Sequence, residues 1–230
     1  MYHVMAENDV NGDNLLRHFH DLSPGNHCLV CVNEDVLFSN VVTTFNNVYN
    51  LATTEEGAIY FSNASSITVR YNNVWGPAGS FFNPTQAATS PNFTNLEAKI
   101  YFNNVYQSGS TTFSALMAFY PDHTWTLPQE VTDNVVYDTR ADARVVYVPM
   151  SDFQSAASFI DRNQWYFPND TGGAGPSFQN SNDGSMKTFT QWNAFLGVGS
   201  IGFDVNGCVK NPNWTDPANG DFTPTSPNPC

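Results

Sequence analysis

Charged residues are scarce in this chain, and basic ones are the scarcest. Asp, Glu, Lys and Arg make up 13% of its 230 residues, and only eight residues are Lys or Arg, so the net charge is −13. Soluble domains typically carry about 25% charged residues. A surface this acidic repels phosphate backbones. We therefore expect no direct nucleic-acid binding.

Cysteine is also scarce, and long apolar runs are missing. The four cysteines are too few to be the main framework of a chain of this length. Cys28 and Cys31 form a lone C-x-x-C, and Cys208 and Cys230 do not supply the second ligand pair that a zinc site needs. We expect all four to be free or buried thiols in a reducing compartment. No apolar run reaches the roughly 18–20 residues of a membrane span, and the N-terminus lacks the pattern of a signal peptide.

Aromatic residues are abundant, with 18 Phe, 10 Tyr and 5 Trp, and they favour β-strands. Fifteen Gly and 14 Pro divide the chain into short segments. About eight segments have strand character, and two of them, 135–138 and 143–149, are joined by a short polar stretch that predicts a hairpin. The other segments that favour strands include 41–45, 66–71, 97–102, 113–120 and parts of 189–208.

These signals predict an all-β protein, an eight-stranded antiparallel jelly-roll β-sandwich with a short N-terminal helix and extended termini. Asp13 can cap the helix, which we expect within residues 8–22. Residues 72–95 and 168–186 have the composition of long surface loops. The predicted organisation is an N-terminal arm with the helix over 1–40, a jelly-roll domain over 41–209 and a Pro-rich C-terminal tail over 210–230.

Several segments, in order, resemble parts of a known family. Residues 118–121, 135–140 and 146–150 are similar to the turns and strand ends of the central block of picorna-like virus capsid proteins. Residues 5–19 resemble the N-terminal helix of one major capsid protein of dicistroviruses, iflaviruses and their marine relatives. The segment 195–198 resembles a Phe-hydrophobic-Gly-hydrophobic element near the end of that protein.

The resemblance implies a structural subunit of a non-enveloped icosahedral capsid that encloses a positive-strand RNA genome. It implies other capsid proteins of the same virion as partners, a possible host receptor, and a location in the virion and, during assembly, in the host cytoplasm. Some of these capsids carry an Asp-Asp-Phe element linked to maturation cleavage. Asp152 and Asp221 each stand before a Phe here without the second aspartate, so that activity is not carried over.

Motifs for catalysis are lacking, so we expect a protein that is not an enzyme and has no cofactor. There is no H-E-x-x-H, G-x-S-x-G or phosphate-binding loop. A glycosidase would need two carboxylates at a defined separation, and the sequence cannot place a pair among Asp138, Asp142, Asp152 and Asp161. Calcium at Asp170 or Asp183 has no supporting ligand spacing.

Exposed aromatic residues remain as candidates for recognition, because such side chains anchor interfaces and receptors. They leave an alternative function open, that of a viral receptor- or glycan-binding spike or a lectin-like β-sandwich domain. The candidate interface or receptor-contact residues are Trp75, Phe81, Phe82, Trp125, Trp165 and Trp214.

Overall fold

The computed structural model describes most of the C-terminal half of the chain and shorter pieces before it. The described residues are 6–8, 14–16, 30–32, 41–44, 47–49, 59–61, 66–76, 82–83, 97–108, 115–118, 127–140, 144–148, 150–169, 177–180, 183–195, 199, 201–227 and 229–230.

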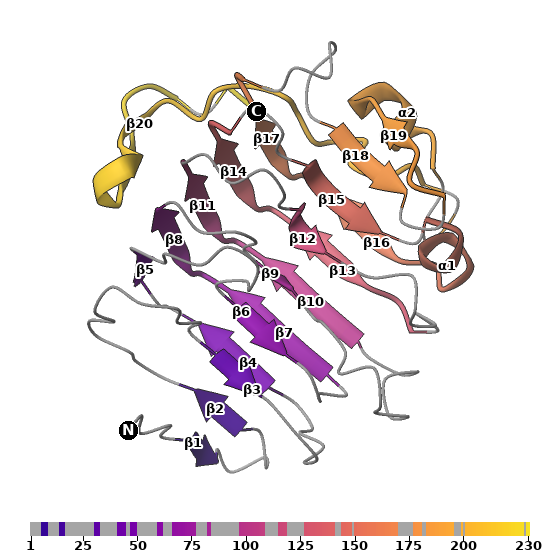
Figure 1. The fold of residues 1–230 in the computed structure, drawn as a ribbon, viewed down its shortest axis with the longest axis horizontal. Helices are drawn as coiled ribbons and strands as arrows, with labels where there is room; N and C mark the ends of the chain where they lie inside the picture. The colour runs from indigo at the N-terminus through magenta and orange to yellow at the C-terminus, as the bar shows by residue number, and fades with distance from the viewer. Residues whose placement is uncertain are drawn as a thin grey trace.

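The protein is a parallel β-solenoid, in which each coil from β4 onward adds one strand to each of three sheets (Figure 1). The first sheet has the order β1-β2-β4-β7-β10-β13-β16, the second β5-β8-β11-β14-β17 and the third β3-β6-β9-β12-β15-β18-β19. Strands from successive coils pair in parallel, and only β1–β2, β18–β19 and the separate pair β20–β21 are antiparallel among the described strands.

The strands of the first sheet are Ala6–Asn8 (β1), Asn14–Leu16 (β2), Val41–Thr44 (β4), Ser66–Arg70 (β7), Glu97–Tyr101 (β10), Glu130–Thr132 (β13) and Phe159–Asp161 (β16). Those of the second are Asn47–Tyr49 (β5), Asn73–Gly76 (β8), Asn104–Gln107 (β11), Val135–Asp138 (β14) and Gln164–Tyr166 (β17). Those of the third are Val30–Val32 (β3), Ile59–Phe61 (β6), Phe82–Asn83 (β9), Ala115–Ala118 (β12), Arg144–Val148 (β15), Ser177–Asn180 (β18) and Met186–Lys187 (β19).

Two short helices and a C-terminal hairpin complete the described structure. The helices are Met150–Ser155 (α1) and Phe189–Asn193 (α2), and the second begins with a capping box between Thr188 and Gln191. The hairpin consists of Trp214–Asp216 (β20), a 3-10 turn at Pro217–Asn219 (η3) and Asp221–Pro224 (β21). In their length and apolar character, the helices of the described ranges fall short of a bilayer-spanning segment.

The core is made of apolar columns that run along the solenoid axis. In the first sheet, Val69, Ile100, Val131 and Ile160 are in register and buried. The second sheet contributes the buried column Val74, Val105, Val136 and Trp165. Alternate residues of each strand point inward, so the period-two pattern of the sequence fits a solenoid as well as a sandwich.

A buried ladder of asparagines lies at the corner between the first two sheets. Asn72, Asn103, Asn134 and Asn163 stack on one another, and successive members are 31, 31 and 29 positions apart in the sequence. The Nδ2 atoms of the first three each donate to the Oδ1 of the next asparagine at 2.9 Å. The same Nδ2 atoms also donate to strand carbonyls, as Asn134 does to Ile100 at 2.9 Å. The ladder therefore fixes the register of neighbouring coils.

This architecture overturns several predictions from the sequence. The antiparallel jelly roll is wrong, because the strand pairs of successive coils are parallel. The expected hairpin is wrong as well, since β14 pairs with β11 and β17, and β15 with β12 and β18. Residues 14–16 form a strand rather than part of a helix, the stretch 72–95 contains β8 and β9, and α2 occupies part of the expected strand region 189–208.

Substituting Asn134→Ala should lower the free energy of unfolding by about 2–3 kcal/mol, because buried donors of Asn103 and the Ile100 carbonyl lose their partner. Asn104→Ala, one step out of the buried ladder, is the matched control and should change stability by no more than about 0.5 kcal/mol. Urea unfolding midpoints measure both. Equal effects of the two substitutions would contradict the role given to the ladder.

Candidate functional site

The corner residue just before each ladder asparagine has an unusual backbone conformation. Tyr71, Phe102, Asp133 and Arg162 have φ of 55°, 55°, 56° and 59°. This left-handed region disfavours bulky side chains and is most accessible to Gly, Asn and Asp. The sharp turn into the ladder requires the conformation, but it does not require aromatic side chains. Two adjacent coils nevertheless carry a Tyr and a Phe there.

These two aromatic side chains are exposed and stacked on each other. Tyr71 is 41% exposed and Phe102 46%. Their ring centroids are 5.3 Å apart with an angle of 5° between the planes. Tyr101, the last residue of β10, meets both rings edge-on, at 6.2 Å from Tyr71 and 5.8 Å from Phe102. Singly exposed apolar residues are common, but a contiguous group of exposed aromatic rings is a candidate surface for recognition.

Arg70 completes this group. Its Nη1 donates to the Tyr101 hydroxyl at 3.1 Å. Its guanidinium lies 5.9 Å from the centroid of the Tyr71 ring and 6.0 Å from that of Tyr101, within range of a cation–π contact. We call Arg70, Tyr71, Tyr101 and Phe102 the corner aromatic cluster.

A second row of asparagines runs along the outside of the second sheet. Asn104 Nδ2 donates to Asn73 Oδ1 at 3.0 Å, and Asn73 Nδ2 donates to Asn47 Oδ1 at 3.1 Å. Asn47 is exposed and the other two are half-buried. An amide has two donor hydrogens and an oxygen with two lone pairs, so each amide has bonding capacity beyond these contacts. We call Asn47, Asn73 and Asn104 the amide column.

The next two coils carry charge at the same corner. Arg162 binds Asp133 through two hydrogen bonds, Nε to Oδ1 at 2.8 Å and Nη2 to Oδ2 at 2.6 Å. The hydrogen bond from Arg162 lowers the pKa of the Asp133 carboxyl. The guanidinium also lies 5.8 Å from the ring centroid of Phe159. The aromatic part of the corner is therefore bounded on one side by an ion pair.

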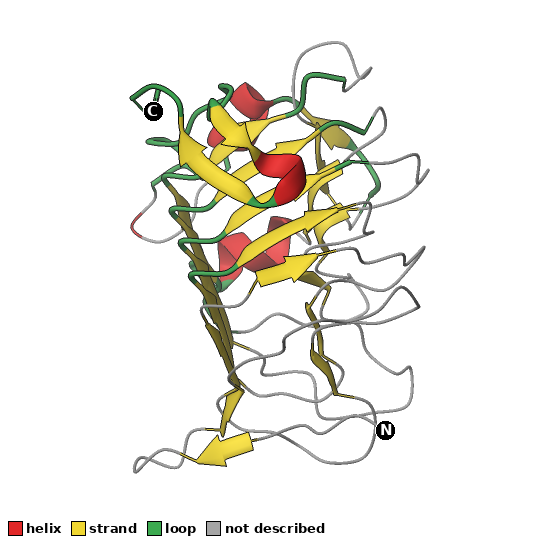
Figure 2. Cartoon of the chain, turned by 90° about the vertical axis from the view of Figure 1, so that its left-hand side faces the viewer, coloured by secondary structure: helices red, strands yellow, loops and turns green. Residues whose placement is uncertain are grey.

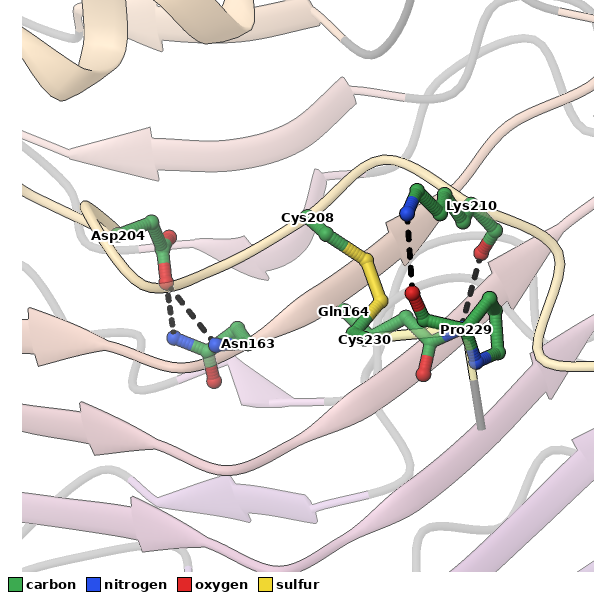
Figure 3. Close-up of a disulfide and its surroundings, with 7 residues drawn as sticks. All are labelled: Asn163, Gln164, Asp204, Cys208, Lys210, Pro229 and Cys230. Carbon is green, nitrogen blue, oxygen red and sulfur yellow. Dashed lines mark hydrogen bonds between the residues drawn. A yellow bond between two sulfur atoms is a disulfide. The ribbon is translucent and has the colours of Figure 1, made fainter. Parts of the chain in front are cut away.

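Asp204 is the most perturbed acid of the described residues, but it is fully buried at the end of the asparagine ladder (Figure 3). Its Oδ1 accepts from Asn163 Nδ2 at 2.7 Å, and its Oδ2 accepts from the indoles of Trp165 at 3.1 Å and Trp192 at 2.9 Å. Burial raises its pKa to about 6. A perturbed carboxyl can mark a catalytic site, but no substrate reaches this one, so we assign it to closing the ladder.

The carboxylates considered for glycoside hydrolysis are not arranged as a catalytic pair in the described structure. Asp138 is buried and pairs with Arg140, whose Nε donates to Oδ1 at 2.8 Å. Asp161 is buried and accepts from the backbone N and the Nδ2 of Asn206, both at 2.8 Å. Asp152 accepts from Ser151 on α1, and Asp142 lies outside the described residues.

Two of the carboxylates considered for maturation cleavage or for calcium binding, Asp221 and Asp183, accept hydrogen bonds from backbone groups two residues further on. The Thr223 backbone N donates to Asp221 at 3.0 Å, and this contact lowers the pKa of Asp221. The Ser185 backbone N donates to Asp183 at 2.8 Å in the same way. Asp170 lies outside the described residues.

Four of the six aromatic residues predicted to make contacts are described, and among these Trp165 lies apart from Trp75 and Trp214. Trp165 is buried in the core and bonded to Asp204. Trp75 lies on β8 and contacts Phe222 of the C-terminal hairpin, to which Trp214 also belongs. Phe82 lies on β9, while Phe81 and Trp125 are outside the described residues.

The corner aromatic cluster and the amide column were missed in the sequence analysis, although a repeated motif marks both. The pattern aromatic-Asn-Asn-Val-aromatic occurs at 45–49, 71–75 and 102–106, and weaker versions follow at 133–137 and 162–166. A self-comparison at a period near 31 residues would have found it. The comparisons with known proteins do not add to this, because no family model, curated protein or solved structure matches the chain.

The Asp204 carboxyl should make stability depend on pH. Because folding raises its pKa from 3.8 to about 6, its contribution is greatest below pH 4 and is lost as the pH rises through 6. Between pH 3.5 and 7 the free energy of unfolding of the wild type should fall by about 3 kcal/mol relative to that of Asp204→Asn. The loss is about 1.4 kcal/mol for each pH unit between the unfolded pKa of 3.8 and the folded pKa of about 6.

Urea unfolding of both proteins across this range measures the difference. Because the amide nitrogen of the variant would face the two indole donors, the variant is expected to be less stable at every pH. NMR titration of the Trp165 and Trp192 indole protons, which donate to Asp204, measures the pKa of the Asp204 carboxyl without need of a variant. A midpoint below 4 would refute the assignment.

Proposed function

We propose that the protein binds a neutral glycan chain at the corner between its first two sheets. The observation that carries this proposal is the pair of exposed, stacked rings of Tyr71 and Phe102, held in a backbone conformation that disfavours them. Aromatic side chains at such sites offer apolar surface to the C–H groups of a sugar. A chain running along the solenoid axis would meet the same motif in successive coils.

The amide column supplies the polar half of such a site. Asn73 and Asn104 follow Tyr71 and Phe102 by two residues, so apolar surface and uncharged hydrogen-bonding groups alternate around the corner. Sugar hydroxyls donate and accept, and amides do both. Binding sites generally combine apolar walls with a few placed polar groups.

The charge of the protein favours an uncharged ligand. A net charge of −13 repels polyanions such as acidic polysaccharides and nucleic acids. Arg70 is the cation within the corner aromatic cluster, and its Nη1 bonds to Tyr101. We therefore place neutral polysaccharides ahead of acidic ones.

The capsid function suggested by the family resemblance stays untested, but the described strands form a parallel solenoid and not the antiparallel sandwich expected of such a capsid protein. The alternative of a glycan-binding domain does not need a sandwich, because it depends on the surface rather than on the fold. Cys208 and Cys230 form a disulfide, which corrects the expectation of free thiols for this pair. Disulfides persist in oxidising surroundings, which favours action outside the cytosol.

The double substitution Tyr71→Asn with Phe102→Asn should weaken glycan binding at least tenfold, a loss of about 1.4 kcal/mol or more, because both exposed rings are removed. Asparagine suits the left-handed corner, so the fold should be retained. Affinity gel electrophoresis against a soluble β-glucan, a xylan, a mannan and an α-glucan, with polygalacturonate as the anionic comparison, measures binding.

Val205→Asn changes an exposed apolar residue in the C-terminal segment and serves as the control, with unchanged binding expected. Binding to the neutral polymer should also be insensitive to salt, because ionic screening affects only charge interactions. Retention of full affinity by the double variant, or binding of polygalacturonate alone, would refute the proposal.

A further inference from the structure

A column of aromatic side chains runs along the outer face of the second sheet, next to the amide column. Trp75, Tyr106, Tyr137 and Tyr166 occupy equivalent positions in β8, β11, β14 and β17. The ring centroids of Tyr106 and Tyr137 are 5.1 Å apart, and those of Tyr137 and Tyr166 are 4.9 Å apart. We call these four residues the sheet aromatic column.

The C-terminal hairpin lies over strands of the second sheet (Figure 2), and two of its rings contact this column. Its Trp214 lies 6.5 Å from Tyr137 and its Phe222 lies 6.1 Å from Trp75, measured between ring centroids. Trp214 and Phe222 also pack edge-to-face at 4.7 Å. Burial raises the pKa of Tyr137, with smaller contributions from its tyrosine neighbours. The hairpin therefore shields rings that would otherwise face solvent.

The hairpin contacts the solenoid through rings, and it bonds strongly to itself. Thr215 Oγ1 donates to the Thr223 carbonyl at 2.9 Å, and Thr225 Oγ1 donates to the Asn213 carbonyl at 2.8 Å. Its anchor lies further back, where the Trp165 backbone N donates to the Cys208 carbonyl at 2.8 Å. There the disulfide joins Cys208 to Cys230 (Figure 3). It is a preformed unit attached at its base.

The covered column and the amide column belong to the same strands. Asn73 and Trp75 both point outward from β8, and Asn104 and Tyr106 both point outward from β11. The chemistry of the proposed binding site, aromatic rings beside amides, thus continues beneath the hairpin. We propose that the sheet aromatic column is a second binding surface for the same neutral glycan, and that the C-terminal hairpin occupies it until it is displaced.

Gly220 offers a way to displace the hairpin without altering the column. It has φ of +82°, and a Cβ there would lie 2.6 Å from Trp75 Cζ2. Gly220→Ala should push the hairpin away from the sheet. Gly184→Ala is the matched control, since Gly184 has φ of +70° but a Cβ would meet only Gln179 Nε2 at 3.7 Å.

Acrylamide quenching of tryptophan fluorescence and the ultraviolet titration of tyrosine report whether the column is uncovered. Opening should increase quenching and return the pKa of Tyr137 toward 10. Should Gly220→Ala leave both signals unchanged, the pair Trp214→Ser with Phe222→Ser removes the two rings that hold the hairpin down, and the binding measurement is made on that variant.

The opened variant should bind the neutral polymer panel at least threefold more tightly than the wild type and than Gly184→Ala, and Tyr106→Ala in the opened background should remove the gain. An opened variant that gains no affinity overturns the inference. The inference uses the ligand class of the proposed function, but the two fail separately. Loss of binding on Tyr71→Asn with Phe102→Asn tests the corner, whereas the gain on opening tests the column.

Discussion

The buried asparagine ladder is the constraint on which the rest of the structure depends. A solenoid turns its chain sharply between sheets, and at the corner the backbone carbonyls of Val69, Ile100 and Val131 need partners inside the protein. Each ladder asparagine donates to a strand carbonyl and to the next member of the ladder, which for Asn163 is the carboxyl of Asp204. Leaving a buried polar group unpaired costs about 1–3 kcal/mol, so an interrupted ladder is expensive and a complete one fixes the coil spacing.

The ladder has a direction, and this determines how it must end. Every Oδ1 accepts from the coil before it, and every Nδ2 donates to the coil after it. The last donor, Asn163, therefore needs an acceptor that does not itself have to donate a hydrogen bond to a further coil. Asp204 meets that need, and Trp165 and Trp192 supply donors to its second oxygen. The raised pKa of Asp204 is the consequence of placing a carboxyl in the core for this purpose.

The sequence indicated the strands well and their arrangement poorly. The alternation in 66–71 and 97–102 predicted strands that the structure has, because inward and outward residues alternate in a coil as they do in a sandwich. Alternation carries no information on whether the partner strand runs parallel. Asn72 and Asn73 fell in the stretch 72–95, which was expected to be a loop, whereas in the solenoid they supply one buried and one external amide, as Asn103 and Asn104 do in the next coil.

The repeated motif was the signal that could have decided between the two folds. It recurs every 26 to 31 residues, a period that is too long for a hairpin and fits one three-sided coil. The disulfide could not be predicted, since neither the spacing of Cys208 and Cys230 nor their flanking residues shows that the C-terminal end of the chain folds back to Cys208. The same holds for the hairpin, because the many prolines of 210–230 suggested an extended tail, whereas Trp214–Pro224 forms an antiparallel pair.

The C-terminal region has two roles: it closes the open end of the solenoid, and it covers part of the second sheet with a hairpin. The final coil would leave open strand edges, and such edges invite pairing with other chains. Residues 201–208 close part of that end, where the Asp204 backbone N donates to the Ile160 carbonyl and the Cys208 backbone N to that of Asn163. The chain then continues across the second sheet and ends in a hairpin above the sheet aromatic column. Only the first of these is required to terminate a solenoid. The second places two aromatic rings on a surface that already matches the proposed binding chemistry, so it is the part of the C-terminal region that calls for a functional explanation.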